Sequence, residues 1–501
     1  MKGTMKKRAI LNFATSMAYQ MINLVIGLIL PKFYTEIFGS AYNGLNQSIN
    51  QIMSLLSVLQ FGISAAAIQQ MFKYIANKDE DMISAIYWDT GRQYRKMGYF
   101  FIMAIVPVAL VFPMLLEDEL PYRIIVAFLL LRTVSSAMEY FFQAKYSVIL
   151  IATNKSYAIY IINILLLLIG TGLHLAVLFT TENILLYQSV ALATTLLRLV
   201  IVSTYIRRQY PYLYKNRSQK TPVLQAGKRK DVMVAEIAGM VVDSTDMLIL
   251  STFSGLVYTS IYSVYNFVTA GLGNVLGSCR EAVFAGLGKT YYEDFDAFKR
   301  KFDSFESVYL FLVFFLYAVA LILFRPFIEV YTAQMDAQYY YAGLPILFVL
   351  AKMAVNLRIP SIVAVNTAGH FKEVKHYAVI EAIINLMVSL LLVKPFGIYG
   401  VLIGTIIGSA YRTPLLVRHA NKHIIKRKQM DYWKKVLLWL PFLAGAYVLG
   451  ELAPIRCSSL LHWIGLAVPV ALAVLLAAVL WLLITDRKTL KQLLRTVIKK
   501  R

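Results

Sequence analysis

The sequence is dominated by apolar stretches of about 20 residues that recur from Ala9 to Ile484. A helix of that length crosses a hydrocarbon layer roughly 30 Å thick and satisfies its backbone hydrogen bonds within itself. The chain is 59% hydrophobic and 15% charged, and a water-soluble fold cannot bury so much apolar surface. The sequence therefore predicts an all-α integral membrane protein.

We expect about fourteen transmembrane helices, because each predicted span is long enough to cross a bilayer. The first span follows a basic N-terminus that resembles a signal peptide, but its apolar segment is too long and lacks a small-residue cleavage site. We therefore interpret it as an uncleaved helix. The predicted spans are 9–31, 42–71, 97–116, 121–143, 157–178, 184–206, 232–253, 259–288, 305–325, 342–365, 377–393, 399–417, 435–453 and 462–485.

Successive loops between transmembrane helices lie on alternate sides of the membrane. The distribution of positive charge tests this arrangement, since cytoplasmic loops retain Lys and Arg. The chain has 50 of these residues and a net charge of +23. Most of them fall on the side of the N-terminus, so both termini are expected in the cytoplasm. The charge then reflects topology and attraction to anionic headgroups, and no nucleic-acid partner is expected. The opposite side carries only Lys32, Arg123, Arg325, Lys394 and Arg456.

A proline-containing basic connection, 207–231, lies near the middle of the first twelve helices. It predicts an N-terminal six-helix bundle in 1–206, a cytoplasmic linker, a second six-helix bundle in 232–418, and helices 13 and 14 with a basic tail in 419–501. A shift of 220 residues aligns the bundles, which indicates a parallel repeat about an axis along the membrane normal. The aligned pairs include Leu30 with Leu250, Tyr42 with Tyr262, Asn46 with Asn266, Arg132 with Lys352, and Arg198 with Arg418.

Three blocks of sequence resemble one family of transporters over essentially the whole chain. They are GLNQSINQIMSLLSVLQFGISAAA followed by KYIANKDEDMISA, DSTDMLILSTFSG with YTSIYSVYNFV, and LRIPSIVAVNTAGHFKEVKHYAVIEAIINLMVSLLL with GIYGVLIGTIIGSAYR. The family is the Wzx-type flippases of lipid-linked oligosaccharides, in the MATE-like MOP superfamily. The resemblance implies two six-helix bundles around a central cavity that opens alternately to each face, with an extra helix pair.

Basic residues inside the spans are candidates for substrate binding, because a charge in hydrocarbon costs at least about 2.5 kcal/mol. A lipid-linked sugar carries a diphosphate, which the guanidinium fork of arginine binds through paired hydrogen bonds. Alternatively, each base pairs with a local acid, as Arg132 could with Glu139, or reaches out to the headgroups. The predicted cations are Arg132, Arg198, Arg280, Lys352, Arg358 and Arg412.

Two further sets of polar residues complete the predicted site. Amides of the second span, among them Asn46 and Asn50, could bond sugar hydroxyls or hold helices together. Glu236, Asp243 and Asp246 lie near one face of the span 232–253 and predict a proton or sodium coupling site, with salt bridges to neighbouring helices as the alternative. No other cofactor and no metal site is expected.

Together these features predict a flippase, and not an enzyme. Its substrate would be undecaprenyl-diphosphate-linked oligosaccharide, moved by alternating access from the inner to the outer leaflet of the bacterial cytoplasmic membrane for cell-surface polysaccharide export. Membrane lipids and other polysaccharide-assembly proteins are the expected partners. A lipid II flippase and a MATE-type drug antiporter remain as alternatives. A membrane-bound polymerase or ligase would need a large outer loop, and the longest predicted one, 326–341, is short.

Overall fold

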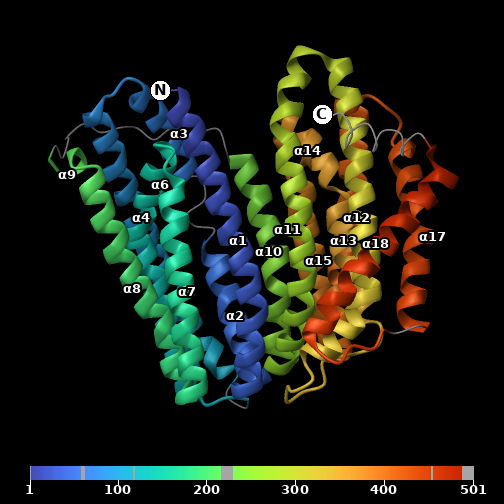
Figure 1. Ribbon diagram of the computed structural model, residues 1–501, viewed down its shortest axis with the longest axis horizontal. Helices are drawn as coiled ribbons and strands as arrows, with labels where there is room; N and C mark the ends of the chain where they lie inside the picture. Colours follow the sequence, from blue (N-terminus) through green and yellow to red (C-terminus); the bar gives the residue numbers. More distant parts are fainter. Residues whose placement is uncertain (1, 58–62, 117–118, 216–229, 453–454, 488–501) are drawn as a thin grey trace. The chain divides into compact units, whose positions relative to one another are not determined.

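The computed structural model describes residues 2–57, 63–116, 119–215, 230–452 and 455–487 (Figure 1). Every regular element in these ranges is helical. Within them, eleven helices are long and apolar enough to cross a membrane. The predicted fold class, an all-α multi-pass membrane protein, is therefore confirmed.

The chain divides into two compact units, of which the first comprises Met1–Met233 and Gly255–Thr259. Its helix α1 packs along α7, and α5 packs against both α4 and α8 (Figure 1). The elements of this unit are α1 (Lys2–Phe38), α2 (Ser40–Ser57), α3 (Ile63–Ala76), α4 (Glu80–Met114), α5 (Tyr122–Met138), the π-helix η2 (Glu139–Gln143), α6 (Ala144–Ala152), α7 (Ser156–Thr180), α8 (Ile184–Gln209) and α9 (Tyr212–Lys215).

The second unit comprises Val234–Ser254 and Ser260–Arg501. Helix α12 packs against α13, α17 and α18 (Figure 1), and α15 and α16 form a tightly packed antiparallel pair. Its elements are α10 (Lys230–Phe253), α11 (Leu256–Glu293), α12 (Phe295–Tyr331), α13 (Leu344–Leu357), α14 (Ile359–Ala368), α15 (Phe371–Phe396), α16 (Ile398–His419), the π-helix η3 (Ala420–Ile425), α17 (Met430–Leu452) and α18 (Leu460–Thr485).

Capping residues and glycines set the helix boundaries. The Asp79 carboxylate accepts a hydrogen bond from the Met82 amide at 3.0 Å and so begins α4, and Asp294 caps α12 in the same way. Gly397, at φ 53°, ends α15 and begins α16, because glycine adopts this left-handed conformation without a steric penalty. Turn chemistry visible in the sequence thus places these ends.

The helices differ from the predicted spans mainly in length. Helix α12 continues through the buried Pro326 to Tyr331, so the connection before α13 is shorter than predicted. The spans 42–71, 232–253 and 259–288 are helical where described, as α2 with α3, α10 and α11, but they are not among the eleven helices that are long and apolar enough to cross a membrane. Much of the predicted linker, residues 216–229, lies outside the described residues.

The α15–α16 pair packs closely because small residues face the neighbouring backbone. A Cβ added at Gly404 would overlap the Ser389 hydroxyl, so this glycine allows the two helices to approach closely. A Cβ at Gly400 would overlap the backbone carbonyl of Leu392, which cannot rotate away. The closest approach of the two helices therefore depends on Gly400.

We expect Gly400→Ala to destabilise the protein by about 1–3 kcal/mol, since the added methyl group forces two helix backbones apart. The measurement is the thermal unfolding midpoint of the purified protein in detergent. Gly445→Ala is the matched control, because Gly445 is an exposed residue of α17 with no atom within 4 Å of an added Cβ. Equal unfolding midpoints for the two variants would contradict the packing argument.

Buried ion pairs fix α17 and the segment before it to α12. The Glu306 carboxylate is 1% exposed and binds Arg427 and also Lys435, the latter at 2.8 Å. Further along α17, Trp439 stacks on Phe314 with ring centroids 5.8 Å apart. The basic chain segment that follows α16 therefore has a defined place in the second unit.

Candidate functional site

An arginine inside a membrane-spanning helix forms the polar centre of the first unit. Arg132, on α5, donates a hydrogen bond from Nη2 to Oδ1 of Asn46 on α2 at 3.1 Å. Gln188, on α8, donates to the same oxygen at 3.5 Å. Tyr34 and Tyr187 lie near the guanidinium, with their rings 4.9 Å apart. Three helices, α1, α2 and α8, thus supply a neutral polar shell around the cation on α5.

Arg132 has no acidic partner among the described residues. Its Nε is buried and has no hydrogen-bond acceptor there. The predicted alternative, an ion pair with Glu139, is not formed, because Glu139 is an exposed residue of the π-helix η2. An uncompensated cation at this depth costs free energy unless an anion binds to it.

Two other predicted cations, Arg358 and Arg412, are paired in the second unit. Both bind the carboxylate of Glu381, which is 0% exposed, and Arg412 does so through Nη1 at 2.8 Å. Ser409 also donates to this carboxylate, at 3.3 Å. Pro360 explains the position of Arg358, because it interrupts the helix and leaves Arg358 at the junction of α13 and α14.

The Glu381 cluster changes the expected roles of these two arginines. Two guanidinium groups share one carboxylate, and the Nε atoms of both are buried without a partner among the described residues. Removing one partner of a buried ion pair costs about 3–5 kcal/mol because the other charge is left unpaired, so α13, α15 and α16 are tied together at this carboxylate. The sequence predicted that Arg358, like Arg132, binds substrate. In the structure Arg358 forms an ion pair with Glu381.

A second polar network in this unit surrounds Asp246 on α10, which is 2% exposed. Its Oδ2 accepts hydrogen bonds from the Tyr262 hydroxyl at 2.8 Å and from Thr405 Oγ1 at 3.2 Å. Asn385 donates to the Thr405 hydroxyl at 3.0 Å, and Lys352 lies near enough to interact electrostatically with the carboxylate. Four helices, α10, α11, α15 and α16, therefore meet at one buried carboxylate.

Oxygen atoms of this network are available as ligands for a small cation. Asp246 Oδ1 and Asn385 Oδ1 are both buried and have no hydrogen-bond donor among the described residues. The hydroxyl of Thr405 and the carbonyl of Val401 lie in the same network. Hard cations such as sodium take carboxylate, amide, hydroxyl and carbonyl oxygens as ligands, so this donor set suits sodium or a proton.

The three predicted acids of α10 do not share one environment. Asp243 is exposed, whereas Asp246, one helical turn further along, is 2% exposed. The side chain of Glu236 lies outside the described residues. The predicted acidic stripe is therefore reduced to Asp246 as the carboxylate that a network encloses.

The remaining predicted residues have looser surroundings. Arg280 on α11 has a side chain that is 41% exposed and lies 3.8 Å from Glu281. Arg198 on α8 and Asn50 on α2 are half-buried. Gln188, Tyr262, Asn385 and Thr405 belong to the polar networks but were not predicted, since one polar residue in an apolar span carries little signal by itself.

Comparisons with known proteins show which solved structures share this helical architecture. No protein-family model and no curated protein sequence matches the chain. Among solved structures, the lipid II flippase MurJ in an inward closed conformation aligns with a TM-score of 0.59 at 16% identity, covering 94% of this chain and 98% of MurJ. An inward-facing multidrug MATE transporter of the MOP superfamily aligns with a TM-score of 0.60 at 12% identity, covering 87% of this chain and 98% of that one.

A third structure agrees with these two. The MATE multidrug transporter DinF-BH aligns with a TM-score of 0.53 at 14% identity, covering 85% of this chain and 96% of DinF-BH. The structural alignments establish the fold. At identities this low they do not identify the substrate, which must be inferred from the residues of the site. The protein therefore has the all-helical transporter fold that MurJ shares with the MATE transporters of the MOP superfamily.

Proposed function

We propose that the protein is a Wzx-type flippase of the MOP superfamily. It moves undecaprenyl-diphosphate-linked oligosaccharide from the inner to the outer leaflet of the bacterial cytoplasmic membrane by alternating access. The observation that carries the proposal is the guanidinium of Arg132, held by Asn46 at 3.1 Å within a membrane-spanning helix and not neutralised by any described acid. A substrate diphosphate would supply the missing negative charge.

The positive charge of the loops supports the orientation in this proposal. Both termini lie in the cytoplasm, so substrate made at the inner leaflet meets the basic face of the protein. The amides of α2, among them Asn46 and Asn50, contact the sugar. Arg198, Arg280 and Lys352 contribute positive potential, while Arg358 and Arg412 act mainly through the Glu381 cluster.

Ion coupling is the second part of the proposal. Asp246, with Asn385 and Thr405, binds sodium or a proton, and occupation of this network biases the helices that meet there. The carboxylate suits this role because its hydrogen-bond donors, Tyr262 and Thr405, are neutral and its other oxygen has no hydrogen-bond partner among the described residues.

Of three alternative functions, the structure opposes two and does not separate the third from the main proposal. A drug antiporter for cations is opposed by the unneutralised Arg132, because like charges repel in a low-dielectric site. A lipid II flippase has the same fold and also handles a lipid diphosphate, so only transport can separate it from the main proposal. A polymerase or ligase is opposed by the short outer connection between α12 and α13.

The proposal is tested by transport in proteoliposomes that contain the purified protein. Three fluorescent probes are compared: an undecaprenyl-diphosphate oligosaccharide, lipid II and the cationic dye ethidium. We expect protein-dependent translocation of the oligosaccharide lipid, measured by its reaction with a membrane-impermeant reagent, and at least about tenfold slower transport of the other two. Translocation of lipid II alone, of dye alone, or of no probe overturns the proposal.

A further inference from the structure

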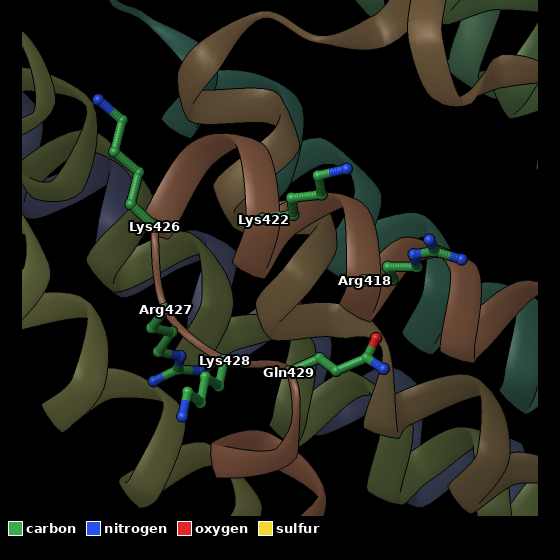
Figure 2. A pocket seen from close by; sticks show the side chains of 6 residues that line it. All are labelled: Arg418, Lys422, Lys426, Arg427, Lys428 and Gln429. Atoms are coloured by element: carbon green, nitrogen blue, oxygen red, sulfur yellow. The ribbon is translucent and has the colours of Figure 1, made fainter.

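A basic hollow of about 460 Å³ lies at the end of α16 in the second unit, and no residue of the Asp246 network lines it (Figure 2). Five of its six lining side chains are cationic and none is acidic. The lining residues are Arg418, Lys422, Lys426, Arg427, Lys428 and Gln429.

The local backbone builds this hollow. Helix α16 passes into the π-helix η3, and the chain then reverses at Lys426, which has φ 59°. A left-handed conformation costs a non-glycine residue about 1–2 kcal/mol, so surrounding contacts must hold it. They are provided by the buried Asn421, whose backbone carbonyl accepts from the Arg427 amide at 3.0 Å and whose Oδ1 accepts from Arg427 Nε at 2.6 Å.

The charges of the hollow are only partly compensated. Arg427 binds Asp303 and Glu306, and Lys426 lies 5.2 Å from the ring centroid of Phe295. Arg418, Lys422 and Lys428 are exposed and form no ion pair with a carboxylate in the described ranges. Figure 2 shows these side chains extending from both sides of the turn. Gathering like charges around a fixed turn is unfavourable until an anion joins them.

The position of the hollow at the end of a membrane-spanning helix indicates which anion binds there. Arg418 and Lys422 lie in the last two turns of the apolar helical span that ends at Ile425, and Lys426, Arg427 and Lys428 follow it directly. From the end of a membrane-spanning helix, long basic side chains reach the lipid headgroups. Basic pockets at that level on the cytoplasmic face attract the phosphates of anionic lipids, and a glycerophosphate headgroup fits within the volume.

We infer that this hollow binds the phosphate of an anionic phospholipid of the inner leaflet. Arg418, Lys422 and Lys428 hold the headgroup, while Arg427 ties the turn to α12 through Glu306. Bound lipid therefore stiffens the junction between α16 and α17. The inference is independent of the transported substrate, since neither Arg132 nor Asp246 takes part.

Binding of short-chain lipids to the purified protein in detergent tests the inference. Dioctanoyl phosphatidylglycerol, dioctanoyl phosphatidylcholine and inorganic phosphate are titrated by thermophoresis. We expect phosphatidylglycerol to bind the unaltered protein at least about tenfold more tightly than the other two ligands, and the double variant Lys422→Gln, Lys428→Gln to lose about tenfold in affinity for it.

The control removes two positive charges elsewhere. Lys96→Gln with Lys372→Gln changes two exposed lysines that do not line the hollow, so its affinity is expected to equal that of the unaltered protein. An equal loss in this control would show general charge attraction and overturn the inference. Tighter binding of inorganic phosphate than of phosphatidylglycerol would also overturn it, since the site would then serve a soluble anion.

Discussion

Arg132→Gln is expected to slow translocation of the lipid-linked oligosaccharide by about tenfold to hundredfold. A hydrogen bond to a charged group contributes about 1.5–3 kcal/mol, and the variant loses the positive charge that would hold the diphosphate. Arg132→Lys keeps the charge but loses the planar fork, so we expect an intermediate rate. The measurement is the initial rate of flipping in proteoliposomes at matched protein density.

The stability of the same variants separates a binding role from a structural one. Because Arg132 is not neutralised by a described acid and its Nε lacks a partner there, Arg132→Gln should leave the unfolding midpoint unchanged or raise it. Arg92→Gln is the control, since Arg92 is an exposed residue of the same unit that pairs with Asp89 at 3.0 Å, and such pairs contribute little. A large loss of stability in Arg132→Gln with normal flipping in the surviving protein would contradict the assignment.

Asp246→Asn is expected to abolish the acceleration of flipping by an ion gradient. The amide of asparagine does not take up a proton near neutral pH, and it has no negative charge with which to bind sodium. Its size matches that of aspartate, so the packing around Tyr262 and Thr405 is preserved. Coupling free energies of about 1–3 kcal/mol correspond to about 5–150-fold, so the gradient effect in the unaltered protein should fall in that range. Flipping is measured with imposed sodium or proton gradients, one at a time.

A neighbouring acid gives the comparison for Asp246. Asp243→Asn removes a carboxylate from the same helix, but this one is exposed and has no enclosing network among the described residues. We expect it to retain most of the gradient response. If Asp243→Asn abolished the response and Asp246→Asn preserved it, the buried network would have no part in coupling.

The charged residues within the membrane-spanning helices could be identified from the sequence, but their individual roles could not. The sequence identified Arg132, Arg358, Arg412 and Asp246 as costly residues in apolar spans, and the structure places all four among polar groups. It could not tell which of the three arginines is neutralised, because the acid that pairs with two of them lies on another helix. The difference lies in Glu381, on a separate helix, which binds Arg358 and Arg412 but not Arg132.

The sequence by itself determined the all-helical membrane fold and the positions of most helices. These follow from local properties, since apolar length, capping residues and glycines act within one helix or turn. Only the tertiary structure decided which buried charges are neutralised and which oxygen atoms of the Asp246 network remain without a donor among the described residues. The physical reason is that a charge is compensated by whatever lies within a few ångströms, and in a helical bundle those neighbours come from other helices.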